Sequence, residues 1–154
     1  MNYAPALLSA ANQAGICAAY YKLCAEHPLV PGSSAKKVPY KEILAAAKGQ
    51  LSLSKLPGPG TVFRVEGLPQ GMSLNFIIQS GGTIETDFSI QQAQRKDGGT
   101  FAILCNEAMK HSGLAAPNPA YPRPICSSSD AMVAAFKRFH ELLLALAQAG
   151  KHAG

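Results

Sequence analysis

The chain has 154 residues, of which 47% are hydrophobic and 15% are charged. This balance excludes a disordered chain, because the apolar residues are numerous enough to form a core and charge repulsion is weak. The net charge of +5, from 14 basic and 9 acidic side chains, is too diffuse to indicate a nucleic-acid-binding protein. We therefore expect residues 1–154 to form a single domain.

Apolar runs are short throughout the chain. The richest run, residues 142–147, is far shorter than the roughly 20 residues that a membrane span needs. The first residues lack the basic segment and the uninterrupted apolar segment of a secretory signal. The four cysteines, at positions 17, 24, 105 and 126, form no C-x-x-C pair. These features predict a cytosolic protein with free thiols and no membrane partner.

Two helices are predicted before the first strand. Small and apolar residues recur at spacings of three and four over residues 5–26, which is typical of one helix with a buried face. Residues 31–34, Pro-Gly-Ser-Ser, predict a loop. A shorter helix is predicted over residues 40–48, and residues 57–60, Pro-Gly-Pro-Gly, separate it from the strands that follow.

Three short antiparallel strands rich in β-branched and aromatic residues are predicted next: residues 61–66, 72–79 and 83–90. The second and third strands alternate apolar and polar residues clearly. A three-residue turn at residues 80–82 pairs Ile78 with Ile84 and Leu74 with Phe88. We prefer this register because it gathers the apolar side chains on one face of the sheet.

The C-terminal third returns to helical spacing. Residues 95–99, Arg-Lys-Asp-Gly-Gly, are expected to end the sheet, and a helix is predicted over residues 101–112. After a proline-rich segment at residues 114–126, Ser127-Ser128-Ser129-Asp130 matches a capping box before a long final helix. The expected fold is α+β, with two N-terminal helices, a three-stranded antiparallel meander and two C-terminal helices packed on one sheet face.

No residue pattern in the chain indicates catalysis, a metal or a cofactor. The histidines and cysteines show no known spacing of a nucleophile and its base. Glu85 and Asp87 are the only acids that point the same way locally, which is weak support for a metal site. Gly98-Gly99-Thr100 precedes a helix and leaves an anion site open as an alternative. We therefore predict a non-enzymatic protein without cofactor or metal.

Two segments outside the predicted sheet are weaker candidates for binding. The basic segment 36–55 carries five lysines, with Glu42 as the only nearby acid: Lys36, Lys37, Lys41, Lys48 and Lys55. Without an aromatic platform beyond Tyr40, a solvated face is preferred there to a contact with nucleic-acid phosphates. The proline-rich run 117–124 has the composition of a ligand for aromatic grooves, but in a compact domain such a run more often packs on its own fold.

The polar face of the predicted sheet is the main candidate site. The preferred register places five polar side chains on this face: Arg64, Ser73, Asn75, Glu85 and Asp87. A solvated face is common in antiparallel sheets. However, side chains on short, rigid strands are already oriented and lose little entropy on binding. We predict that Arg64, Asn75, Glu85 and Asp87 contact a protein partner.

A resemblance in layout gives this prediction a concrete form. It is carried by the strands at residues 73–79 and 84–90, by the run Gly98-Gly99-Thr100-Phe101-Ala102-Ile103-Leu104 and by the final helix, about half of the chain. In this layout the chain resembles small α/β immunity proteins encoded beside bacterial contact-delivered (polymorphic or type VI) toxins. The resemblance implies a protein that neutralises one cognate toxin by covering its active site.

The net charge restricts which toxin that would be. A partner for a basic nuclease is expected to be strongly acidic, whereas this chain is basic, so the implied toxin is of another kind. The alternative function is a small-ligand-binding protein or an enzyme whose site is assembled from scattered residues such as Glu85, Arg95 and Thr100.

Overall fold

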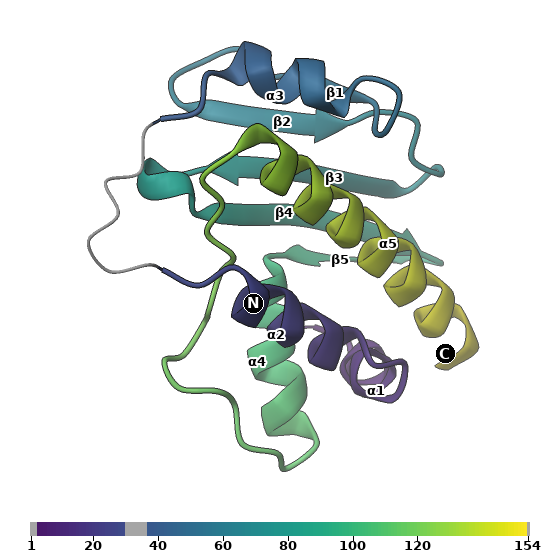
Figure 1. Cartoon of the computed structure of the whole chain (residues 1–154). Helices are drawn as coiled ribbons and strands as arrows, with labels where there is room; N and C mark the ends of the chain where they lie inside the picture. The colour runs from purple at the N-terminus through teal and green to yellow at the C-terminus, as the bar shows by residue number, and fades with distance from the viewer. Residues whose placement is uncertain (1–2, 30–36, 154) are drawn as a thin grey trace.

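The computed structural model of the protein describes residues 3–29 and 37–153 (Figure 1). The loop expected at residues 31–34, and Lys36 of the basic segment, lie outside the described residues. Within the described ranges, none of the helices combines the length and the apolar character that crossing a membrane requires.

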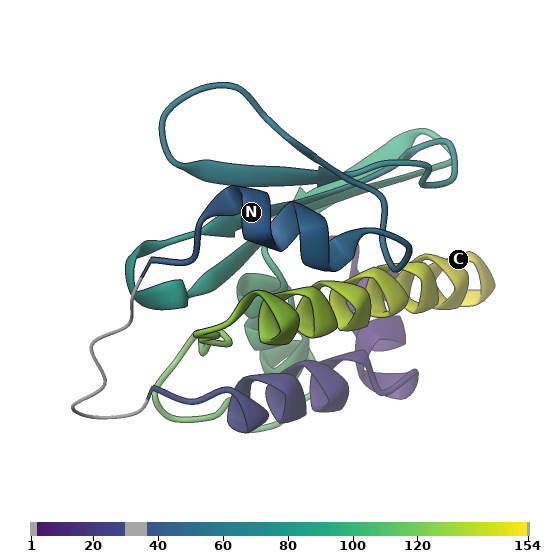
Figure 2. The same cartoon turned by 45° about the horizontal axis from the view of Figure 1, so that its top comes forward.

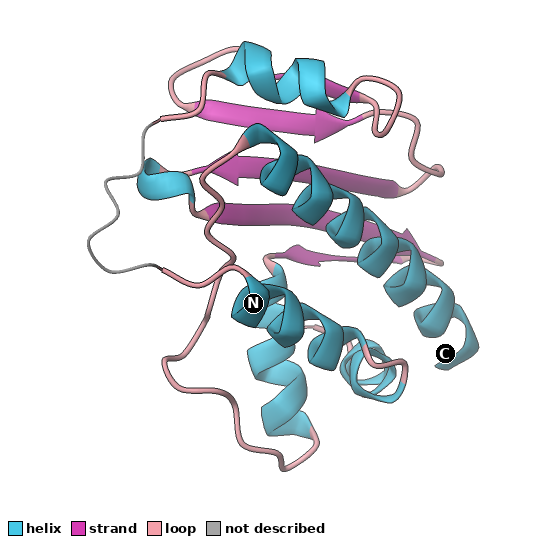
Figure 3. Ribbon diagram, viewed as in Figure 1, coloured by secondary structure: helices cyan, strands magenta, loops and turns pink. Residues whose placement is uncertain are grey.

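A five-stranded antiparallel sheet runs through the molecule in chain order (Figure 3). Its strands are β1 (Leu53–Lys55), β2 (Thr61–Val65), β3 (Met72–Ile78), β4 (Ile84–Gln92) and β5 (Arg95–Gly99). The short turn η1 (Ser80–Gly82) joins β3 to β4. The predicted pairing of Ile78 with Ile84 and of Leu74 with Phe88 is confirmed.

The prediction of a three-stranded meander is wrong, because a further strand flanks it on each side. β1 has only three residues, too few for an alternating pattern to be recognised. β5 consists of residues with low β propensity, and its pairing with β4 determines its conformation. A Cβ atom at Gly98 would stand 2.7 Å from the Phe88 carbonyl oxygen, so glycine allows the two strands to approach this closely.

Five helices accompany the sheet in the described residues: α1 (Pro5–Gln13), α2 (Ile16–Glu26), α3 (Tyr40–Ala47), α4 (Phe101–His111) and α5 (Ser129–Ala153). The prediction of one helix over residues 5–26 is wrong. Gly15, with a φ of +75°, takes a left-handed conformation that separates α1 from α2. The cap of α5 is Ser128, one residue later than predicted, and its Oγ accepts a hydrogen bond from the Ala131 amide at 3.1 Å.

The described helices lie on one side of the sheet (Figure 2). α3 and α5 lie next to the sheet, and α1 and α2 lie on the far side of α5 (Figures 1 and 2). We call the sheet face toward α3 and α5 the inner face and the opposite one the outer face. The outer face is the one that the predicted partner-binding residues occupy.

The core between the inner face and the helices is built from aromatic rings. Phe76 of β3 stacks on Phe136 of α5 with 4.1 Å between ring centroids. The side chains predicted to form the core are all buried: Leu74, Phe76, Phe88, Phe136 and Phe139. Their inward orientation on β3 and β4 directs the alternating polar residues of these strands to the outer face.

Candidate functional site: the outer sheet face

A row of polar side chains crosses four strands on the outer face. The register places Ser54, Arg64, Asn75 and Asp87 next to one another across β1, β2, β3 and β4. Arg64 and Asp87 are exposed, and Asn75 is half-buried between them. Among the described residues, no helix covers this face (Figure 2). We call Arg64, Asn75 and Asp87 the polar row.

A small apolar patch lies beside the polar row. Val62 of β2 pairs with Ile77 of β3, and Ile77 pairs in turn with Glu85 of β4. Val62 and Ile77 are both half-buried although they face away from the core. The outer face therefore combines a small apolar patch with charged groups on adjacent strands, a combination that protein interfaces commonly show.

Asn75 carries an unsatisfied hydrogen-bond acceptor. Its Oδ1 atom is buried and has no hydrogen-bond partner among the described residues. A buried polar group without a partner costs about 1–3 kcal/mol, and asparagine is depleted in strands. Asn75 therefore destabilises the strand in which it lies.

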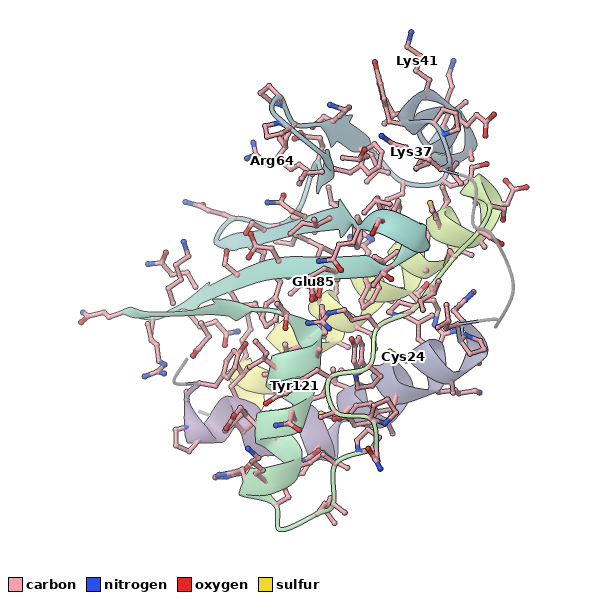
Figure 4. All side chains as sticks on the ribbon, turned by 90° about the vertical axis from the view of Figure 1, so that its left-hand side faces the viewer. Cys24, Lys37, Lys41, Arg64, Glu85 and Tyr121 are labelled. Carbon is pink, nitrogen blue, oxygen red and sulfur yellow. The ribbon has the colours of Figure 1, made fainter. Side chains whose placement is uncertain are left out.

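Glu85 lies on the same face but is not free. The Nε group of Arg123 donates a hydrogen bond to its Oε2 atom, and the amide of Thr86 donates to its Oε1 atom at 3.0 Å. The Glu85 side chain is only 10% exposed, and Figure 4 shows it beside the proline-rich segment. The structure thus brings Arg64, Asn75 and Asp87 together and leaves Glu85 beside them with its carboxylate already paired.

The proline-rich segment 114–126, which we call the strap, packs on its own fold. The Tyr20 hydroxyl donates to the Pro122 carbonyl at 2.6 Å, and the Ile84 amide donates to the Pro124 carbonyl at 3.0 Å. β5 pairs with β4 only from Phe88 onward. The strap therefore covers the part of the β4 edge that β5 leaves open, and it brings Arg123 to Glu85.

Removing Arg123 is expected to destabilise the fold measurably. In Arg123→Ala the buried Glu85 carboxylate loses its counter-charge, so we expect the free energy of unfolding to fall by about 2 kcal/mol. The effect is smaller than for a fully buried ion pair, because the Arg123 side chain is 35% exposed. Urea unfolding measures the change, with Arg138→Ala, whose contact with Glu26 is 4.0 Å and exposed, as the control. Equal effects of the two variants would contradict a structural role for the Arg123–Glu85 pair.

The Cys126 thiol lies beside a histidine but in an environment that disfavours a nucleophile. The Sγ atom of Cys126 lies 3.6 Å from Nδ1 of His27, which is the contact expected of a nucleophile and a base. However, burial raises the pKa of Cys126 to about 11, so the group is a neutral thiol near pH 7. All four cysteines are buried and unbridged. In the described ranges, no group of three or more histidine, cysteine or acidic side chains could hold a metal.

The residues of the alternative scattered site have separate partners. The Oγ1 atom of Thr100 accepts a hydrogen bond from the Ile103 amide at 3.0 Å, and the Phe101 amide donates to Thr86 Oγ1 at 3.1 Å. Both amides belong to the first turn of α4, which is the place of the alternative anion site. Arg95 pairs with Asp97 at 3.2 Å, whereas Glu85 pairs with Arg123. These contacts therefore do not bring Glu85, Arg95 and Thr100 together in one site.

Compared with known proteins, this chain matches no family model, and no curated protein or solved structure is significantly similar to it. The resemblance in layout to toxin-immunity proteins therefore stays a prediction. What the chain can do has to be inferred from its own residues, of which the polar row and the apolar patch beside it form the most coherent exposed group.

Proposed function

We propose that this chain is a non-enzymatic protein-binding domain that docks its partner on the outer sheet face. In its most concrete form it is an immunity protein that neutralises a cognate bacterial toxin by direct binding. The observation that supports the proposal most is the unsatisfied Asn75 oxygen in the middle of the polar row. Local features that destabilise a fold are expected at functional sites.

The charges of the polar row define the partner surface that fits it. Arg64 and Asp87 stand on either side of Asn75 and are exposed. A partner with an acidic group opposite Arg64 and a basic group opposite Asp87 would be electrostatically complementary. Val62 and Ile77 would form the apolar centre of such an interface, where binding energy is usually concentrated.

Removing the Asn75 acceptor by substitution should raise the stability of the fold and weaken binding of the partner. We expect Asn75→Val to raise the free energy of unfolding by about 1 kcal/mol, because the unsatisfied group is removed and valine favours strands. The same variant should bind the partner about tenfold more weakly, since it lacks the polar contact. Urea titration and calorimetric titration measure the two effects.

Ser73→Val is the matched control for that variant. Ser73 faces the same way, but its hydroxyl is satisfied by Ser89 at 2.6 Å, so valine there removes a hydrogen bond and should not stabilise the fold. If Asn75→Val fails to stabilise the chain, or leaves partner binding unchanged, Asn75 does not have the proposed role.

If this chain is an immunity protein, we expect the gene immediately upstream to encode a large toxin, and co-production of the two proteins tests this. We expect that protein to arrest growth when it is produced alone, and this chain to restore growth and to co-purify with it. The charge-swapped variant R64E/D87R should lose both effects, whereas K137E/E141K, a swap between two exposed residues of α5, should retain them. Absence of growth protection by the unaltered chain would overturn the immunity proposal.

A further inference from the structure

The surface around α3 carries most of the net charge of the protein. In the described range 37–55, four lysines stand against the single acid Glu42, which leaves three of the five net positive charges of the chain. The lysines are Lys37, Lys41, Lys48 and Lys55. The ion pairs of the described residues are formed by Arg95, Arg123 and Arg138, so none of these lysines has a carboxylate partner within the described part of the chain.

Lys41 lies in the first turn of α3, and Lys48 is the residue directly after its end. Lys41, Ala45 and Lys48 follow one another at intervals of four and three residues and are all exposed, so the exposed side of α3 leads from Lys41 to the residue that ends the helix. The two ammonium groups belong to positions about 10 Å apart along the helix axis. Figure 4 shows Lys37 at the same corner of the molecule as Lys41, which extends into solvent. A ligand with regularly spaced negative charges fits this face.

An open cavity adjoins the end of α3. It has a volume of about 560 Å³ and is lined by Leu44 and by residues 47–53, which include Lys48, Leu51 and Leu53 as well as the polar residues Gln50 and Ser52. The three leucines are half-buried. Three leucines beside a lysine suit an apolar side chain that lies next to a carboxylate.

We propose that the α3 surface, made of Lys41, Lys48 and this leucine-lined cavity, binds an acidic peptide segment of a protein partner. Carboxylates of the segment pair with the two lysines, and one of its apolar side chains enters the cavity. Single-stranded nucleic acid fits less well, because bases need aromatic platforms. The ring of Tyr40, the exposed aromatic residue of this surface, already carries the Lys55 ammonium group 5.1 Å from its centroid.

The test uses a short, fluorescein-labelled peptide in which glutamates alternate with leucines, and fluorescence anisotropy at low salt. We expect K41E/K48E to bind the peptide at least about tenfold more weakly, because two attractive contacts become repulsive. K41Q/K48Q should give an intermediate loss. The matched control K22E/K110E carries the same change in net charge on exposed residues of α2 and α4, and it should stay within about threefold of the unaltered chain because distant charges are screened.

Two comparisons show whether the site has the proposed chemistry. Replacing the leucines of the peptide by serine should weaken binding about fivefold through the loss of the apolar contact. A thymidine oligonucleotide of equal charge should bind more weakly than the peptide. The proposal would be overturned if K41E/K48E and K22E/K110E lost the same affinity for the peptide. It would also be overturned if the serine peptide bound as tightly as the leucine peptide, or if the oligonucleotide bound more tightly than the peptide. R64E/D87R should leave peptide binding unchanged, which separates this surface from the outer sheet face.

Discussion

Phe136→Ala is expected to lower the free energy of unfolding by about 3–5 kcal/mol, the range for truncation of a buried aromatic ring. Phe136 is fully buried. Its ring stacks on Phe76 at 4.1 Å and lies 6.0 Å from the Phe63 ring, so the variant opens a cavity between α5 and the middle strands of the sheet. Urea titration followed by circular dichroism measures the loss.

Leu144→Ala is the control on the same helix. Leu144 is 37% exposed, so truncation should cost less than about 1 kcal/mol. If Phe136→Ala lowered the free energy of unfolding no more than Leu144→Ala, α5 would not pack on the inner sheet face as described. The outer face could then not be assigned as the face that is free to bind a partner.

Gly82→Ala is expected to destabilise the protein by more than about 3 kcal/mol, because a left-handed conformation costs a non-glycine residue 1–2 kcal/mol before any clash is added. The φ of Gly82 is +84°, and a Cβ atom there would overlap the Cys126 carbonyl oxygen. The Cys126 amide also donates to the Gly82 carbonyl at 3.0 Å. The variant should therefore detach the end of the strap from the turn between β3 and β4, which thermal and urea unfolding would detect.

Gly81→Ala separates the clash from the backbone strain. Gly81 has nearly the same φ, +80°, but a Cβ atom there would meet nothing within 4 Å. Its substitution should cost only the strain, about 1–2 kcal/mol. Similar losses in the two variants would show that the strap does not approach Gly82 as closely as the structure describes.

The central strands could be predicted because their sequence pattern is strong. β3 and β4 alternate apolar and polar residues over most of their length, and only one turn length brings Leu74 opposite Phe88 with both side chains inward. The edge strands could not be predicted in the same way. The residues of β5 are those of a turn, and tertiary pairing with β4 outweighs their low intrinsic propensity.

The break between α1 and α2 could not be predicted from the sequence for a related reason. Gly15 stands within an uninterrupted run of helical spacing, and an isolated glycine in such a run is often tolerated. Only its positive φ shows that the chain changes direction there. Gly81 and Gly82, by contrast, lie between two clear strands, and their role in a turn was predictable from the sequence.

The candidate site was predictable in part. The strand register places Arg64, Asn75 and Asp87 in one row, and an alternating pattern contains that information. The pairing of Glu85 with Arg123 joins residues 38 positions apart through a strap with no periodic pattern, so local sequence carries no signal for it. The buried state of the Asn75 oxygen likewise depends on its three-dimensional neighbours.

The most direct test of the proposed docking face is photocrosslinking in cells of the source organism. A benzoylphenylalanine placed at Ile77, in the apolar patch beside the polar row, should form a crosslink to one protein, and R64E/D87R should abolish that crosslink. The same photoreactive residue at Leu144, exposed on α5, should give none. A crosslinked protein at Leu144 but not at Ile77 would contradict the account, because it would place the partner on the helical side of the molecule.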